Sequence, residues 1–491
     1  MILKEEKVAK FLGFDLSTTA LAAGVLSEKG RVEDFVSIPI RGAVKWLGQP
    51  AFDLSYIPGM ILDALEALRK NGWSFHHYGS LSFSVRQHDM VLADREMEPC
   101  CPALSWRCNA AVSETRFLKD RGVEKMVGKI EERFILPKLA WVLGEMPELR
   151  EKLLYVMTTG DYIATLLTGR ARLSTSDALS NGLLLQKTKK LAVKAMTEAD
   201  LAPVWFPDPI QSGRIVGTVN HDRSLPEGWG KISWILKGWK FIASLGDNHA
   251  GGVGCGLADD RTIVISAGSS GTVIRRCQPG EVLLGSAACF EYYKDRLLLM
   301  MLADCAIWYD RFVRRYGKGY PLRQLDGFAL AVDPRRLRRV RKVYDGSRNW
   351  KEAYPDDWAS LSLGERVAST QASIALELLI LAKKMLQEVP NGTQVGRFVI
   401  TGGLSQSQFF QNVLEAGLSL LLPRAKVVVS NRCGPLASQS ATLGALINAM
   451  VGIGFYPSLA AAVSELCPLQ PSCCSTGGLR KSIQGFLVPR L

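Results

Sequence analysis

The chain has no apolar run of membrane-spanning length, and residues 1–7 hold two glutamates in place of a signal peptide's apolar core. Histidine is scarce, with 5 in 491 residues, and the 11 cysteines lack the paired spacing of a metal site. Cys100 and Cys101, for example, are adjacent rather than two residues apart. We therefore expect a cytoplasmic protein with no membrane partner, whose thiols are buried or inert.

Nucleic-acid modules are also absent, although the formal net charge is +13. Six of the cations lie close together, between Arg335 and Lys342. This segment is interpreted either as a solvated surface or as a patch that meets a phosphorylated ligand or a partner. Without a known module we expect no nucleic-acid partner. With 47% hydrophobic and 22% charged residues over 491 positions, the chain is typical of a globular protein of two or three domains.

Residues 244–272, near the middle of the chain, hold the most informative pattern. Asp247 stands on a glycine-flanked turn that enters a run of small residues, where a helix can pack closely against a neighbour. A strand then ends in the turn 268–271, whose amides and hydroxyls can surround a phosphate. An acid beside a phosphate-binding turn is the minimum needed to transfer a phosphoryl group to a hydroxyl.

The first part of the chain predicts a meander of strands over 11–20, 21–26 and 31–40, then a helix over 57–68 and a strand over 78–85. The second part predicts strands over 261–267, 272–276, 397–401 and 426–429, with helices over 364–388, 407–421 and 437–450. A strand, a hydroxyl and glycine turn, a strand, a helix and a strand thus occur twice. This order favours a duplicated α/β nucleotide-binding fold with a cleft between the copies, although unrelated α/β domains would share the same pattern.

Several ordered segments resemble the FGGY carbohydrate kinases, a family of actin-like (ribonuclease-H-like) ATPases. The turn 14–19 is similar to their first phosphate turn, and 85–94 is similar to the segment that meets the sugar in xylulokinases. The segments 136–141, 160–169 and 174–178 are similar to the family's lid and core signatures. The turns at 246–250, 266–271 and 401–403, with 443–445, are similar to its catalytic, second phosphate and adenosine motifs.

The resemblance implies two actin-like domains, each with a mixed sheet flanked by helices, and a cleft between them. It implies domains at 1–256, on the sugar and Mg²⁺-phosphate side, and 257–455, on the nucleotide side, with an extension over 456–491. Asp247 is then the catalytic base and Asp15 the Mg²⁺ ligand. The implied nucleotide contacts are Ser17, Thr18, Thr19, Ser269, Ser270, Gly271, Gly402 and Gly403. The implied substrate contacts are Gln87, His88, Trp106, Asp247 and Asn248.

Each residue also has a structural interpretation. Asp15 before Ser-Thr-Thr is often an Asx turn, and Asp247 can cap the helix that follows it. His88 at a strand end is often a packing residue. The glycines of 251–256 lack the dinucleotide-binding spacing and are interpreted as close helix packing.

The chain departs from the family at 106–110, where a Trp-x-Asp-x-Arg pattern is usual. Cys108 and Ala110 stand in place of the aspartate and the arginine. A thiol does not accept charge-assisted hydrogen bonds as a carboxylate does, so the usual hydroxyl pattern of the sugar is in question. The family's Gly-Glu-Arg-x-Pro loop is not evident either, and the second phosphate turn has Ser269 where threonine is usual.

Together these features predict a kinase that uses ATP and Mg²⁺ to phosphorylate a hydroxyl of a small-molecule sugar or polyol, with a ketopentose as the first choice. A glycerol-like polyol kinase is an alternative. A second alternative is a non-catalytic member of the family that senses a sugar. The replacement of the family's aspartate by Cys108 favours this alternative, and the retention of Asp15 and Asp247 opposes it. The sequence leaves the oligomeric state open, a homodimer included.

Overall fold

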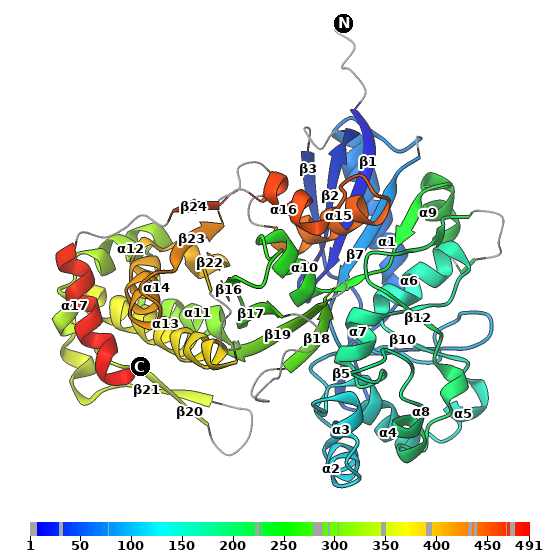
Figure 1. Cartoon of the computed structure of the whole chain (residues 1–491), viewed down its shortest axis with the longest axis horizontal. Coiled ribbons are helices and arrows are strands. Elements are labelled where there is room, and N and C mark those ends of the chain that lie inside the picture. The colour runs from blue at the N-terminus through cyan, green and yellow to red at the C-terminus, as the bar shows by residue number, and fades with distance from the viewer. Residues whose placement is uncertain are drawn as a thin grey trace, which may run out of the picture. The chain divides into compact units, whose positions relative to one another are not determined.

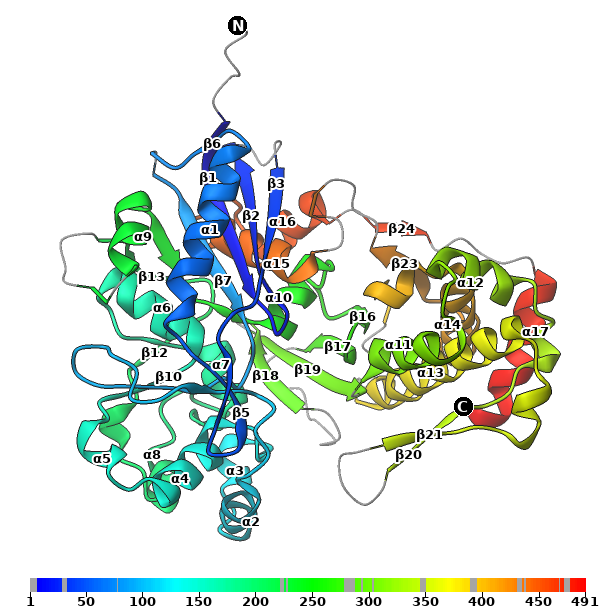
Figure 2. The same ribbon diagram turned by 180° about the vertical axis from the view of Figure 1, so that it is seen from behind.

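The structure, a computed structural model, divides into two compact units that are interleaved along the chain (Figures 1 and 2). Unit 1 holds 1–254, 289–297 and 432–467, and unit 2 holds 255–288, 298–431 and 468–491. The structure describes residues 7–28, 33–76, 78–220, 225–226, 228–277, 288–292, 295–302, 304–344, 350–388, 395–430, 435–436, 439–467, 469–471 and 477–491. Within these ranges no helix is long and apolar enough to cross a membrane.

The strands of the first 254 residues are β1 (Lys7–Leu16), β2 (Ala20–Ser27), β3 (Glu33–Pro39), β4 (Ala43–Trp46), β5 (Gln49–Phe52), β6 (Trp73–Ser74), β7 (Ser80–Val85), β8 (Val91–Ala93), β9 (Ala103–Leu104), β10 (Tyr155–Met157), β11 (Leu173–Ser174), β12 (Pro209–Ile210), β13 (Ile215–Thr218), β14 (Lys240–Ile242) and β15 (Leu245–Gly246). The helices of unit 1 are α1 (Tyr56–Lys70), α2 (Val112–Asp120), α3 (Glu124–Val127), α4 (Ile135–Glu145), α5 (Leu149–Lys152), α6 (Thr159–Thr168), α7 (Thr175–Ser180), α8 (Val193–Glu198), α9 (Trp229–Ile235), α10 (Asp247–Gly254), α15 (Ser440–Gly452) and α16 (Leu459–Leu466).

The strands after residue 254 are β16 (Thr262–Ala267), β17 (Gly271–Cys277), β18 (Ala288–Tyr292), β19 (Asp295–Leu302), β20 (Arg341–Tyr344), β21 (Trp350–Ala353), β22 (Arg397–Thr401), β23 (Lys426–Ser430) and β24 (Leu469–Pro471). The helices of unit 2 are α11 (Cys305–Tyr316), α12 (Leu322–Leu330), α13 (Leu363–Gln387), α14 (Gln408–Leu421) and α17 (Gly477–Leu487).

A mixed sheet with the order β13-β14-β7-β1-β2-β3 forms the centre of unit 1. β1 and β2 make an antiparallel hairpin, while β7 runs parallel to β1 and β14 parallel to β7. β1, β2 and β7 are rich in apolar residues because helices cover both faces of the sheet. α1 lies on one face and α15 on the other, as the two opposite views show (Figures 1 and 2).

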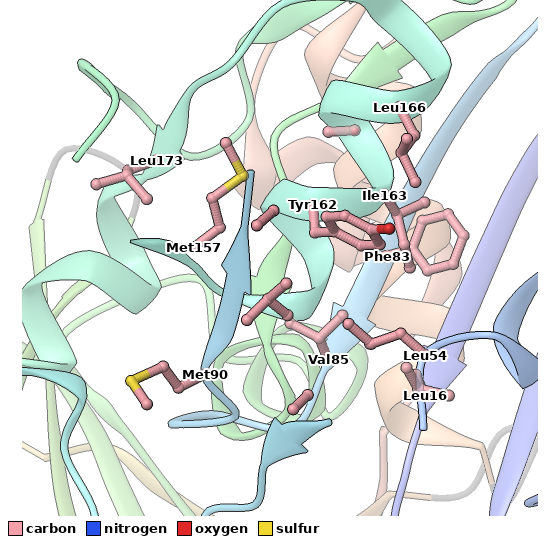
Figure 3. Close-up of a cluster of buried hydrophobic side chains, with 14 of the residues drawn as sticks. Leu16, Leu54, Phe83, Val85, Met90, Met157, Tyr162, Ile163, Leu166 and Leu173 are labelled. Carbon is pink, nitrogen blue, oxygen red and sulfur yellow. The ribbon is translucent and has the colours of Figure 1, made fainter. Parts of the chain in front are cut away.

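Buried apolar side chains join this sheet to its helices (Figure 3). Phe83 and Val85 of β7 lie beside Tyr162 and Ile163 of α6, and Leu16 at the end of β1 lies next to Leu54 in the same cluster. The Phe83 ring is also stacked on a neighbouring phenylalanine of β1, with centroids 4.6 Å apart. This core fixes the ends of β1 and β7, where Asp15 and residues 86–89 lie.

α10 and α15 pack backbone to backbone in unit 1. A Cβ built on Gly444 would stand 1.8 Å from the carbonyl oxygen of Ala250, and one built on Gly254 would stand 1.9 Å from that of Ser440. Glycine is therefore required at both positions. The close packing predicted for the small-residue run after Asp247 is confirmed.

The sheet of unit 2 repeats the strand directions of unit 1. β16 and β17 form an antiparallel hairpin, and β22 and β23 continue the sheet in parallel beside β16. The hairpin β1-β2 followed by parallel β7 and β14 has the same arrangement. The two α/β copies expected from the repeated pattern are thus present.

Most predicted elements have direct counterparts, from β1–β3, α1 and β7 to β16, β17, β22, β23 and the helices α13–α15. The strand predicted over 11–20 ends at Leu16, because the amide and hydroxyl of Ser17 both donate to the carbonyl of Ala20 and close a turn. Positions 31–32, 437 and 438 and the helix stop expected at Pro390 lie outside the described residues. The predicted domain limits at 256 and 455 stay a prediction.

Candidate active site

Asp15 lies at the end of β1 and is placed by the register of the sheet. It pairs with Ser84 of parallel β7, whose hydroxyl donates a 2.7 Å hydrogen bond to Oδ1 of Asp15. Burial raises the pKa of Asp15 to about 6, against the effects of this hydrogen bond and of the Arg86 charge. Arg86 also donates to the carbonyl of Ser17.

The first turn, Ser17 to Thr19, joins β1 to β2 directly after Leu16, the last residue of β1. The hydroxyl of Ser17 accepts from the amides of Thr19 and Ala20, at 3.4 and 3.2 Å. Thr18 and Thr19 are exposed. Two hydroxyl side chains are thus available to a ligand at the carboxyl end of β1.

Asp247 is the first residue of α10 and follows directly on β15, which runs parallel to β7. Its Oδ1 accepts from the backbone amide of Asn248 at 2.8 Å and from Nδ2 of Asn248 at 3.1 Å. The same Nδ2 donates to Oε1 of Gln87 at 2.8 Å, and Nε2 of Gln87 lies 3.1 Å from Nδ1 of His249. This network links residues from the ends of two parallel strands and orients the Asp247 carboxylate.

The carboxylate of Asp247 has an environment suited to proton transfer. Burial raises the pKa of Asp247 to about 7, and the nearby charge of Asp15 adds to the rise, while backbone amides of Asn248 and Gln87 oppose it. A base titrating near 7 is half ionised at neutral pH and binds its proton strongly enough to take one from a hydroxyl. The charge of Asp15 thus acts on the Asp247 carboxylate within unit 1.

Gln87, His88 and Trp106 also lie in unit 1, after β7 and β9. His88 has a φ of 70°, in the left-handed region that non-glycine residues seldom adopt. Its ring is stacked on Phe134 with centroids 4.7 Å apart. The amide of Trp106 donates to Oδ1 of Asp89, 2.9 Å away, and Asp89 forms a buried ion pair with Arg86. These contacts hold the two segments next to each other.

The sequence reasoning gave no role to two buried carboxyls on α6 and α7. Asp161 accepts from the Thr158 hydroxyl and the Ser174 amide, and burial raises its pKa to about 7. Neither carboxyl oxygen of Asp177 has a hydrogen-bond partner among the described residues. Burial, reinforced by other carboxylates including Asp247, holds the pKa of Asp177 well above its usual range. Segment 174–178 had pointed to this region only through the family resemblance.

In unit 2, the residues expected to bind nucleotide come together at the β16-β17 turn and the end of β22. Ser269 is exposed and Ser270 half-buried. A Cβ on Gly271 would stand 2.7 Å from a methyl group of Leu378. Gly402, with φ at +93°, lies against the backbone of residues 267 and 268, while Gly403 has open space around it. These glycines place two turns side by side.

Cys108 is fully buried, close to the equally buried ammonium group of Lys138. Burial raises the pKa of the Cys108 thiol, although the backbone amide of Ala110 and the Lys138 charge oppose the rise. Lys138 donates to the carbonyl oxygens of His88, Leu104 and Ser105. Burial lowers the pKa of Lys138 to about 8. The position where the family has an aspartate thus adjoins a buried cation.

Four of the five arginines of the basic segment, Arg335 to Lys342, have carboxylate partners within unit 2. The ion pairs are Arg335–Asp333 at 2.6 Å, Arg336–Glu365 at 2.5 Å, Arg338–Asp357 at 2.7 Å and Arg339–Glu377 at 3.3 Å. These pairs neutralise much of the segment's charge, which favours its interpretation as a solvated surface.

The oxygen donors of unit 1 fit a magnesium ion. Mg²⁺ is usually held by one or two carboxylates and keeps several waters. Asp15 and Asp247 supply two carboxylates near each other, and Asp15 has only one oxygen engaged by Ser84. Among the described residues no group of three or more His, Cys, Asp or Glu side chains is placed to hold a metal, so an all-protein cage is not offered.

Residues 10–254 match the model of the FGGY family of carbohydrate kinases, N-terminal domain. The chain belongs to this family. It is 28% identical over 264 residues to the xylulose kinase of Streptomyces rubiginosus, covering 52% of this chain and 53% of the relative. It is 24% identical over 272 residues to that of Staphylococcus xylosus, covering 54% and 55%. The chain thus spans about half the length of the curated relatives it matches.

Solved structures match nearly the whole chain. The ligand-bound xylulose kinase from Lactobacillus acidophilus superposes with a TM-score of 0.82 at 16% identity, covering 99% of this chain and 97% of that one. Gluconate kinase from the same organism gives 0.82 at 17% identity, covering 98% and 97%. This likeness establishes the fold, an actin-like α/β architecture, and confirms the predicted fold class.

Proposed function

We propose that the protein transfers the γ-phosphoryl group of ATP to a hydroxyl of a small sugar, with a ketopentose as first candidate. The observation that carries the proposal is the carboxylate of Asp247. Asn248 donates two hydrogen bonds to Oδ1 of Asp247 at the start of α10. The pKa of Asp247, raised to about 7, suits a general base. The xylulose kinase relatives, which match about half of the chain, favour the ketopentose.

The chemistry assigned to Asp247 is proton removal. As the hydroxyl oxygen forms its bond to the γ-phosphorus, its proton passes to Asp247, and the bond from that phosphorus to the bridging oxygen breaks to release ADP. Gln87, His88, Trp106 and Asn248 orient the sugar. The roles of these residues follow from their matched positions and from the network around Asp247.

Phosphate binding is assigned to the two hairpin turns. Ser17, Thr18 and Thr19 in unit 1, and Ser269, Ser270 and Gly271 in unit 2, offer hydroxyls and amides to the β- and γ-phosphates. Gly402 and Gly403 permit close approach of the nucleotide. Asp15 would hold Mg²⁺, which when bound neutralises charge on the phosphates.

Two alternatives are decided by the same experiment. A polyol kinase would act on glycerol-like acceptors, and a non-catalytic member would bind sugar or nucleotide without turnover. Buried Cys108 in place of the family aspartate favours altered specificity or loss of activity. A coupled assay of ADP release, over a panel of ketoses, aldoses and polyols with Mg-ATP, separates the three. Turnover with a ketopentose that Asp247→Asn abolishes supports the proposal, whereas sugar binding by calorimetry without turnover supports the non-catalytic alternative.

A further inference from the structure

His88 hydrogen-bonds through Nδ1 to a side chain far away in the sequence. Nδ1 lies 3.0 Å from Oδ1 of Asn181, at the end of α7. Both side chains are buried. A neutral imidazole ring has one N–H and one acceptor nitrogen. If Nδ1 is the donor in this hydrogen bond, Nε2 is an acceptor, and if Nδ1 is the acceptor, Nε2 is a donor.

The orientation of the Asn181 amide is fixed at both of its atoms. The backbone N–H of Ile135 donates to Oδ1 at 3.1 Å, so that atom is the oxygen. Nδ2 donates to the backbone carbonyl of Asp177 at 2.8 Å, so that atom is the nitrogen. If the amide were flipped, its NH₂ group would face the N–H of Ile135 and its oxygen would face the carbonyl oxygen of Asp177, so neither hydrogen bond could form.

Because Oδ1 of Asn181 is an acceptor only, Nδ1 of His88 must carry the hydrogen. Burial, with the nearby charges of Arg133 and Lys138, holds the pKa of His88 well below its usual range, so the ring is neutral. Nε2 then has no hydrogen and is an acceptor. No described residue is hydrogen-bonded to Nε2, whereas the ring plane is held by Phe134 and the His88 carbonyl by Lys138.

We propose that Asn181 is a positioning residue that fixes His88 as the Nδ1–H tautomer, so that Nε2 recognises a hydroxyl of the substrate as a hydrogen-bond acceptor. The inference rests on the proposed function for its ligand, a polyhydroxylated sugar. It predicts that the group facing Nε2 must be a donor. A hydroxyl satisfies Nε2, while a carbonyl oxygen, an ether or a deoxy position leaves a buried acceptor unpaired.

The tautomer is measured on the full chain with ring-¹⁵N histidine, by long-range proton–nitrogen correlation. With 5 histidines in the chain, comparison with His88→Gln assigns the signals. We expect the ligand-free protein to show a protonated Nδ1 and an unprotonated Nε2. Asn181→Ala should shift His88 toward a mixture of tautomers, whereas the exposed control Asn71→Ala should not. A protonated Nε2 in the wild-type chain overturns the proposal even if a variant fails to fold.

Xylulose is the probe for the second half of the inference. On binding, followed by calorimetry, it should move the Nε2 resonance toward that of a hydrogen-bonded acceptor and leave Nδ1 in place. Asn181→Ala should raise KM by roughly 2- to 10-fold with a smaller change in kcat, as expected for one neutral hydrogen bond. Binding without a shift of Nε2 overturns the sugar contact. If no sugar of the panel binds, the proposed function and the contact both fail, while the tautomer is still decided by the ligand-free spectrum.

Discussion

Asp247→Asn tests the proposed chemistry with little change of shape. Asn has the same size, and its oxygen can still accept from the Asn248 amide that holds Oδ1 of Asp247. What it lacks is the ability to take up a proton. The variant should therefore fold, bind ATP and lose turnover by roughly 10²- to 10⁴-fold at pH 8, the usual contribution of a general base.

The pH dependence gives a second, sharper magnitude. Only ionised Asp247 can act as base, and its pKa is raised to about 7. Wild-type kcat/KM should thus rise tenfold per pH unit below that value and level off above it. At pH 5 roughly 1% of molecules carry the carboxylate, so wild-type activity should fall to about a hundredth of its plateau. Asp247→Asn should lack the acid limb that begins near pH 7. Any fall below about pH 6, where Asp15 titrates, is shared by both proteins and cancels in the ratio of their rates, so this ratio should narrow about 100-fold on acidification.

The assay is coupled ADP release with a ketopentose across pH 5 to 9, with thermal unfolding to verify the fold. Asp63→Asn is the matched control, since Asp63 is an exposed carboxylate on α1 paired with Arg41. It should keep wild-type rates and profile. Wild-type turnover in Asp247→Asn, or the same acid limb in both proteins, would refute the role of Asp247.

Three further predictions concern stability in urea. Gly444→Ala should cost at least about 1–3 kcal/mol, because its Cβ meets a backbone carbonyl at 1.8 Å. Gly144→Ala, in an open part of α4, should gain about 0.5–1 kcal/mol, and equal effects would refute the packing argument. Asp177→Asn should be more stable than the wild-type protein at pH 8, and this difference should vanish near pH ~4. The reason is that a carboxyl group whose pKa is raised in the folded state destabilises the fold as the pH rises and the group ionises. A difference in stability that is constant with pH would contradict this. The urea midpoint of Cys108→Asp should equal or exceed that of Cys108→Asn, because the new carboxylate would adjoin the Lys138 ammonium. A lower midpoint for Cys108→Asp would show that this ammonium does not lie beside position 108.

Local chemistry was sufficient to predict the elements that present the site. Asp15, with the three hydroxyl residues that begin at Ser17, predicted the β1-β2 turn, and the glycines around Asp247 predicted a helix start with close packing. Both signals lie within a few residues of the feature they describe. By contrast, nothing in the order of residues indicated that 432–467, with α15, group with the first unit. That grouping depends on the packing of the α10 glycines against α15, a contact that forms only in the folded chain.

The same distinction separates the identity of a site residue from its hydrogen-bonding state. A matched motif can assign a histidine to position 88, but the proton on its ring is determined by Asn181, which is 93 residues away. The pKa of Asp247 likewise depends on Asp15 at the end of another strand. Burial strengthens both effects, because few waters remain to satisfy a misplaced proton or screen a second charge. The donor or acceptor character of a candidate site is therefore decided by tertiary contacts, even where the sequence places every residue correctly.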